Sequence, residues 1–269
     1  MIEILLAAAI CAKFENWTPP ETCPDDPDNL CHVTLAEKYA DARNFDAATY
    51  FLCQAEESIA PAEFDGMMEH LQNMRAGKET APLRFCDHVT SGYGSTYCAN
   101  VAWDEAMPKL EARISRIGNA ELRKRGIAYA DAEASRIGEQ SKGGTGSSAI
   151  LLHAEIEQKT RLADTLEALT KKRAPAVTDA EAKAADAELN AAYKAVQKTL
   201  DELSVDDEET FAEWKTRLRD AQRAWIAYRD AFATYYAERW KGTAPPEVLR
   251  REVITYLTRK RSAELRKED

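Results

Sequence analysis

The longest regular pattern of hydrophobic positions in the chain runs from Phe211 to Arg239. Large apolar side chains recur there at alternating steps of three and four residues, the spacing of one face of an α-helix. They are Phe211, Trp214, Leu218, Ala221, Trp225, Tyr228, Phe232 and Tyr235. Aromatic side chains on such a face bury a large apolar area. The pattern therefore predicts a long amphipathic helix packed against other helices.

Similar spacing predicts helices along most of the chain and no strands. Two pairs of Thr and Glu three residues apart, Thr34 with Glu37 and Thr178 with Glu181, are typical of capped helix starts. Helices are expected over 34–43, 47–58, 61–75, 104–117, 120–139, 149–172, 178–203 and 211–239, and from Pro246 onward. The first two resemble one unit of a tetratricopeptide or Sel1-like repeat. We therefore expect an all-α protein, with helical hairpins followed by an antiparallel three-helix bundle.

Composition and charge suggest two parts. A chain of 269 residues is long enough for two modest domains, and Pro175 marks the expected boundary. Residues 1–103 contain 16 acidic and 6 basic residues, whereas the rest of the chain contains 30 of each. The net charge of −10 therefore lies entirely in the first part. It argues against nucleic acid as a partner and is compatible with a cationic protein, or with a solvated acidic surface.

The N-terminus, residues 1–12 (MIEILLAAAICA), is typical of a signal peptide or its remnant. An apolar run is followed by small residues, although no Lys or Arg precedes it. Nothing else approaches the length of a transmembrane segment. The predicted organisation is thus a leader at 1–12, an acidic disulfide-linked helical region at 13–174 and a helical bundle at 175–269.

All six cysteines lie in the acidic part, which favours disulfides and a periplasmic or secreted protein. Cys86 and Cys98 enclose a short segment and are the first pair expected. Cys31 and Cys53 could join two adjacent helices. The rival interpretation is a zinc site made of Cys31, His32, Cys86 and His88, but these spacings match no common zinc pattern.

The sequence contains no strong catalytic or cofactor motif. The Gly- and Ser-rich segment 141–148 has its Lys before the glycines and follows no predicted strand, so it is interpreted as a linker and not as a phosphate-binding loop. None of the four histidines has a Ser or Cys nucleophile at a recognisable spacing. We therefore expect a protein that is not an enzyme and needs no cofactor or metal.

Three segments near the C-terminus carry a family resemblance: 185–196 (ADAELNAAYKAV), 218–232 (LRDAQRAWIAYRDAF) and 257–265 (LTRKRSAEL). In this order and spacing they resemble the LprI lysozyme inhibitor domain. The residues that carry the resemblance are Leu189, Asn190, Tyr193, Gln222, Trp225, Arg229, Asp230, Thr258 and Arg259. Ala231 and Tyr236 stand where that family has cysteines. The resemblance implies an exported, helical, non-enzymatic domain and, with it, inhibition of lysozyme.

The best candidate for a binding site lies between Asp87 and Thr96. The segment 85–98 (FCDHVTSGYGSTYC) is similar to one found ahead of this domain in some exported bacterial proteins. Gly92 and Gly94 are expected to prevent regular structure there, and Tyr93 and Tyr97 offer rigid contact surfaces. The alternative is a cross-linked connector. Acidic residues that could attract a cationic partner such as lysozyme are Asp87, Asp25, Asp26 and Asp28.

Four polar residues of the C-terminal part are interpreted as structural, although a binding patch is the alternative. They are Asn190, Gln222, Arg229 and Asp230. Arg229 is expected to pair with Glu188 or Asp186 on the preceding helix. The sequence thus predicts a protein-binding module of the bacterial cell envelope, with lysozyme as the expected target. The alternative is a periplasmic scaffold without inhibitory activity.

Overall fold

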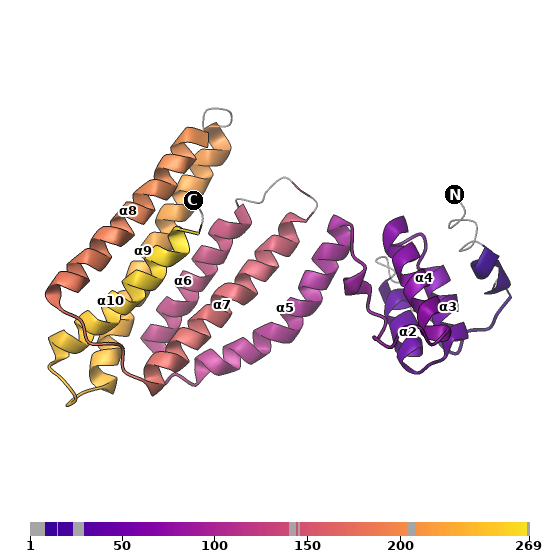
Figure 1. The fold of residues 1–269 in the computed structure, drawn as a ribbon, viewed down its shortest axis with the longest axis horizontal. Helices are drawn as coiled ribbons and strands as arrows, with labels where there is room; N and C mark the ends of the chain where they lie inside the picture. Colours follow the sequence, from indigo (N-terminus) through magenta and orange to yellow (C-terminus); the bar gives the residue numbers. More distant parts are fainter. Residues whose placement is uncertain are drawn as a thin grey trace. The chain divides into compact units, whose positions relative to one another are not determined.

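The computed structural model describes residues 9–14, 16–23, 30–139, 144, 146–203 and 208–267. These residues are mostly helical and form no β-strand, which confirms the all-α fold (Figure 1). The chain divides into two compact units, residues 1–98 and 99–269, each with its own hydrophobic core. Asp25, Asp26, Asp28, half of segment 141–148 and residues 1–8 of the expected leader lie outside the described residues. None of the described helices is long and apolar enough to cross a lipid bilayer.

Unit 1 is built on a helical hairpin and a third helix. Its elements are η1 (Ala12–Phe14), α2 (Leu30–Asp41), α3 (Phe45–Gln54), α4 (Pro61–Arg75), η2 (Phe85–Asp87) and the start of α5 (Gly92–Ser115). Helix α3 packs against both α2 and α4. Asn44 caps α3 by accepting the backbone N–H of Ala47 at 3.2 Å. The predicted hairpin is therefore present, and α4 has the predicted bounds.

The predicted starts of two helices in unit 1, α2 and α5, are wrong. Thr34 does not cap a helix, because α2 begins at Leu30 and the Thr34 hydroxyl donates to the Leu30 carbonyl inside it. Glu37 instead accepts the backbone N–H of Phe85 at 2.6 Å. Gly92 and Gly94 do not prevent regular structure either, since α5 begins at Gly92. A Cβ atom at Gly94 would lie 2.8 Å from a Glu63 carboxylate oxygen, so this glycine permits a close approach.

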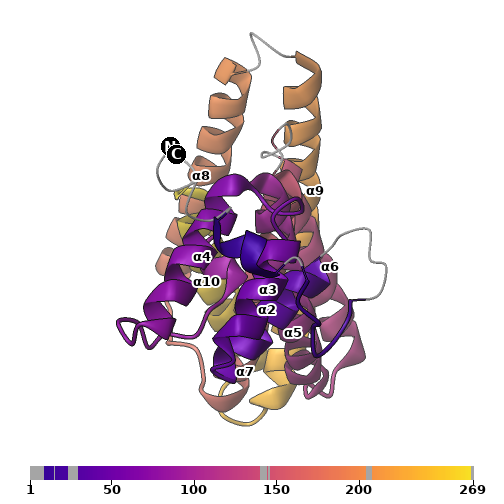
Figure 2. The same cartoon turned by 90° about the vertical axis from the view of Figure 1, so that its right-hand side faces the viewer.

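Unit 2 is a helical bundle organised around one long helix. Its elements are the rest of α5, α6 (Ala120–Glu139), α7 (Ser147–Lys171), α8 (Asp179–Leu203), α9 (Glu208–Arg239) and α10 (Pro246–Leu265). Helices α8 and α9 form an antiparallel hairpin, seen from two sides in Figures 1 and 2. Helix α9 also packs extensively against α6 and α10, while α10 packs against α8 and α6 against α7. The predicted amphipathic helix thus contacts several partners.

The predicted hydrophobic face of α9 is buried along its middle. Leu218, Trp225 and Phe232 are each at most 2% exposed. Toward the C-terminal end, Tyr236 is fully buried while Tyr235 stays half-exposed. The Tyr236 hydroxyl accepts the backbone N–H of Ala174 at 2.6 Å. This hydrogen bond joins the C-terminal end of α9 to the link between α7 and α8.

The expected domain boundary at Pro175 lies inside unit 2. Thr178 and Glu181 exchange hydrogen bonds at the start of α8, as the capping box predicts. Arg173 binds both carboxylate oxygens of buried Glu252 on α10, at 2.8 and 2.5 Å. The link is therefore anchored to the bundle, and the division of the chain into regions 13–174 and 175–269 stays a prediction.

Candidate functional site

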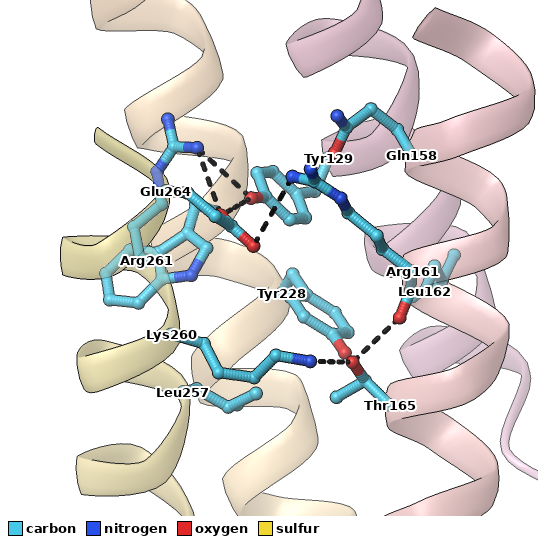
Figure 3. A pocket seen from close by; sticks show the side chains of 11 residues that line it. Tyr129, Gln158, Arg161, Leu162, Thr165, Tyr228, Leu257, Lys260, Arg261 and Glu264 are labelled. Carbon is cyan, nitrogen blue, oxygen red and sulfur yellow. Dashed lines mark hydrogen bonds and ion pairs between the residues drawn. The ribbon is translucent and has the colours of Figure 1, made fainter. Parts of the chain in front are cut away.

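A cluster of charged side chains is buried between helices α6, α9 and α10 of unit 2, beside the pocket of Figure 3. Arg261 on α10 donates to both carboxylate oxygens of Glu133 on α6, at 2.6 and 3.0 Å. Arg136, three residues after Glu133, donates to the same carboxylate at 2.7 and 3.2 Å. The three residues are each at most 2% exposed. A buried carboxylate thus lies between two guanidinium groups, and each oxygen accepts more than one hydrogen bond.

The side chains of this cluster keep one protonation state around neutral pH. Burial alone would raise the pKa of Glu133, but Arg261 and Arg136 outweigh it and lower that pKa to about 2. Burial raises the pKa values of Tyr129 and Tyr228 above the ordinary value of tyrosine. None of these groups exchanges protons near neutral pH, where a general acid or base operates. The cluster therefore favours a structural or binding role over acid–base catalysis.

A small cavity of about 30 Å³ adjoins the cluster. Figure 3 shows its walls, which come from α6, α7, α9 and α10 and carry several cationic and hydroxyl groups. Glu264 accepts from the Tyr129 hydroxyl at 3.1 Å and from Arg261 at 3.4 Å. The cavity is large enough for a water molecule or a small ion.

Of the polar residues singled out in the sequence, Gln222 reaches this cluster. Its side-chain oxygen accepts from Arg261 Nε at 3.4 Å. The expected partners of Arg229 are wrong. Arg229 donates to its neighbour Asp230 at 2.7 and 2.9 Å and lies over the Trp225 ring, 5.2 Å from its centroid. Asn190 lies exposed on α8. Structural roles for these residues stay predictions.

Sequence reasoning missed Glu133, Arg136 and Arg261. The Glu133–Arg136 spacing of three residues is common on exposed helix faces, where such pairs contribute little. The segment 120–139 is heavily charged and only weakly apolar, so nothing in its pattern distinguishes these residues. The structure buries Glu133 and Arg136 of this helix, while others such as Glu121 stay exposed.

In unit 1, the structure joins Cys86 to Cys98, the pair expected first. Asp87 is exposed beside this disulfide, and Tyr93 at the start of α5 is 47% exposed. Tyr97 is half-buried and packs edge-to-face on Phe85, with ring centroids 5.9 Å apart. The disulfide-linked segment (residues 86–98) thus presents Asp87 and Tyr93 to solvent, while Tyr97 supports the core.

Glu63 on α4 positions this segment. Its carboxylate is fully buried and accepts the backbone N–H groups of Thr90 at 2.9 Å, Ser91 at 2.7 Å and Ala60 at 3.0 Å. Burial raises the pKa of Glu63, but the N–H donors outweigh it and lower the pKa. One carboxylate therefore fixes the start of α4 and the turn that leads into α5. The sequence offered no sign of this long-range role.

The pairing of Cys31 with Cys53 is wrong. The structure joins Cys31 to Cys23, and Cys53 to Cys11, with Cα–Cα distances of 5.8 and 5.5 Å. The preceding N-terminal segment supplies a cysteine to each helix of the hairpin. A zinc site at Cys31, His32, Cys86 and His88 is excluded because both thiols are in disulfides. Among the described residues, no three His, Cys, Asp or Glu side chains form a group that could hold a metal ion.

Two histidines meet beside the disulfide-linked segment. His70 on α4 and His88 lie 3.1 Å apart, between Nδ1 and Nε2. His70 Nε2 lies 3.1 Å from the carbonyl of Ala81, which can only accept, so His70 Nδ1 is the acceptor for His88 when both rings are neutral. Burial, and then the neighbouring His70, lower the pKa of His88.

We predict that unit 1 loses stability as the pH falls below about 6.5, the ordinary pKa of histidine. The unfolded chain binds a proton at His88 more readily than the folded chain does, so acid favours unfolding. Thermal unfolding at several pH values should show a smaller loss between pH 7 and pH 5 in His88→Gln. The exposed His153 on α7 supplies the control, His153→Gln. Equal pH dependence in wild type and His88→Gln would contradict the prediction.

Comparison with known proteins finds a family match for the C-terminal third of the chain. Residues 167–265 match the family model described as lysozyme inhibitor LprI. This LprI-like region (residues 167–265) runs from the end of α7 to the end of α10. An uncharacterized protein of Rhizobium meliloti (strain 1021) is 39% identical over 92 residues, which are 33% of this chain and 66% of that protein. The match thus spans slightly less than two thirds of the relative. No solved structure matches the chain significantly.

The comparison confirms the resemblance seen in the sequence and limits it to one part of unit 2. The LprI-like region supplies Arg261 and Gln222 to the buried cluster and Trp225 to the wall of the cavity. Glu133 and Arg136 come from α6, outside the match. The charged cluster therefore joins the LprI-like region to the helices that precede it.

Proposed function

We propose that this protein is an exported, non-enzymatic module of the bacterial cell envelope that binds lysozyme and inhibits it. The observation that carries the proposal is the match of residues 167–265 to the lysozyme inhibitor LprI family. The buried charges of unit 2 agree with a binding protein, since their pKa values lie far from neutrality.

Export is supported by the cysteines. All six form disulfides within unit 1. Disulfides persist in the periplasm and outside the cell and are rare in the reducing cytosol. We therefore propose a periplasmic or secreted location.

The charge of unit 1 supports a cationic partner. Its 98 residues include 16 acidic and 6 basic residues, whereas unit 2 contains 30 of each. Asp41 and Asp46 are already paired with Arg84 and Arg75. Asp87 has no ion pair among the described residues, so its charge is available to a partner. We propose that Asp87 and Tyr93, together with Asp25, Asp26 and Asp28, contact the basic surface of lysozyme.

The test is calorimetric titration of the full chain with a c-type lysozyme, at low and at physiological salt, beside a cell-wall lysis assay. We expect binding that weakens with salt and that slows lysis. Asp87→Asn should weaken binding several-fold. Asp186→Asn, which makes the same charge change at an exposed site on α8, should change it less than about twofold.

Two results would contradict the proposal at different levels. An absence of binding at both salt concentrations would reject lysozyme as the target. Binding that both variants leave unchanged would retain lysozyme but reject Asp87 as a contact.

A further inference from the structure

The cavity beside the buried charged cluster contains more positive than negative charge. Three cationic side chains line it, Arg161, Lys260 and Arg261, whereas Glu264 is the one carboxylate of the lining. Arg136 and Arg261 share the carboxylate of Glu133, and Arg261 also contacts Glu264. Arg161 is paired with Glu157 and lies 4.0 Å from Glu264. Arg161 and Arg261 therefore have carboxylate partners, and Lys260 is the third cation of the lining.

Lys260 is the lining cation that bonds to a neutral group. Its ammonium group donates to the Thr165 hydroxyl at 2.8 Å and lies 5.9 Å from the centre of the Tyr256 ring. Within the described part of the chain it forms no ion pair. Thr165 uses its own proton to bond the Arg161 carbonyl at 2.7 Å, so it offers Lys260 an oxygen without negative charge. A half-buried ammonium group thus lacks a counter-ion.

Tyr228 supplies an independent indication of a ligand. Its side chain is 3% exposed, and its hydroxyl is buried without any hydrogen-bond partner among the described residues. It lines the same cavity, and Figure 3 shows its hydroxyl end directed toward the side where Lys260 meets Thr165. Leaving a buried hydroxyl unpaired costs about 1–3 kcal/mol, so tyrosines in such places usually have a partner.

We propose that this cavity binds a small monovalent anion such as chloride, held by the Lys260 ammonium group and the Tyr228 hydroxyl. The anion would accept a hydrogen bond from the Tyr228 hydroxyl and serve as the counter-ion of the Lys260 ammonium group. A water molecule could accept the same hydrogen bond from the hydroxyl, but it would leave the Lys260 ammonium group without a counter-ion. The cavity of about 30 Å³ suits an ion of one atom better than sulfate or phosphate. The anion links α9 and α10 and rests against α7, so binding stabilises unit 2.

The test is thermal unfolding of the full chain, followed by tryptophan fluorescence, as sodium gluconate is exchanged for sodium chloride at constant ionic strength. Gluconate is too large for the cavity, and equal ionic strength removes differences in screening. We expect the Tm of unit 2 to rise by about 3–6 °C at a chloride concentration ten times the dissociation constant. Four of the five tryptophans lie in unit 2, so the signal reports mainly on it.

Three variants locate the effect. Tyr228→Phe removes one hydroxyl and Lys260→Met one charge, and each should reduce the chloride-dependent rise to less than about 1 °C. Tyr256→Phe removes a hydroxyl next to Lys260 but outside the cavity and should keep the full rise. If Tyr228→Phe does not fold, Lys260→Met decides the question. Equal Tm values in the two salts, or a full rise in Lys260→Met, would overturn the proposal.

Discussion

Replacing Glu133 by Gln is expected to destabilise unit 2 by about 3–5 kcal/mol, because the buried guanidinium groups of Arg261 and Arg136 then lose the carboxylate that both of them bind. Removing one partner of a buried ion pair costs more than the pair itself contributes, since the remaining charge has lost its water and its counter-ion. For a unit of this size we expect Tm to fall by about 2–4 °C for each kcal/mol. Urea unfolding followed by tryptophan fluorescence measures the change.

The matched control is Glu121→Gln on the same helix. Glu121 pairs with Arg125 at 2.7 Å, but both side chains are exposed to solvent. Such pairs contribute about 0.5 kcal/mol or less, so the control should unfold almost as wild type does. A Glu133→Gln variant within 1 kcal/mol of wild type would show that the cluster is hydrated and that its charges are screened.

The lowered pKa of the Glu133 carboxylate leads to a prediction about stability at low pH. Its pKa is about 2 in the folded protein, below the ordinary value near 4.3 that it has in the unfolded chain. Its contribution to stability is therefore complete above about pH 4.3 and is lost as the pH falls toward 2. The Glu133→Gln variant should lose less stability than wild type over this interval.

Replacing Glu63 by Ala is expected to destabilise unit 1 by about 3–4 kcal/mol. The backbone N–H groups of Thr90, Ser91 and Ala60 would all lose the acceptor that now bonds them in a buried site. Each hydrogen bond to a charged group contributes about 1.5–3 kcal/mol, and the losses are not additive because water can enter the space left. Amide hydrogen exchange at Thr90 and Ser91 should accelerate together with the loss of stability.

Glu69→Ala is the control, since Glu69 lies exposed on the same helix and should change stability by less than about 0.5 kcal/mol. If binding to lysozyme uses Asp87 and Tyr93, Glu63→Ala should also weaken it, because the segment that carries them loses its anchor. Unchanged exchange at Thr90 and Ser91 would contradict the role assigned to Glu63.

The elements of this protein follow largely from local spacing. The bounds of α4 and α6 match those expected from the sequence, and the Thr178–Glu181 box starts α8 as predicted. The buried face of α9 follows the three-and-four pattern as far as Phe232. These features depend on residues within one or two turns of each other, so the sequence pattern alone contains them.

The candidate sites depend on residues that are far apart in the chain. Arg261 and Glu133 are separated by 128 residues, and Glu63 lies 27 residues before Thr90. No local pattern distinguishes these charges from the many exposed ones on the same helices. Which of them become buried, and against what, depends on how the helices pack.

The sequence by itself thus determined an all-α chain, its helices, the acidic cysteine-rich first part and the likeness to the LprI family. The tertiary structure alone decided which cysteines pair, which charges are buried and which side chains line a cavity. The physical reason is that helix formation depends on neighbours in sequence, whereas burial and ion pairing depend on neighbours in space.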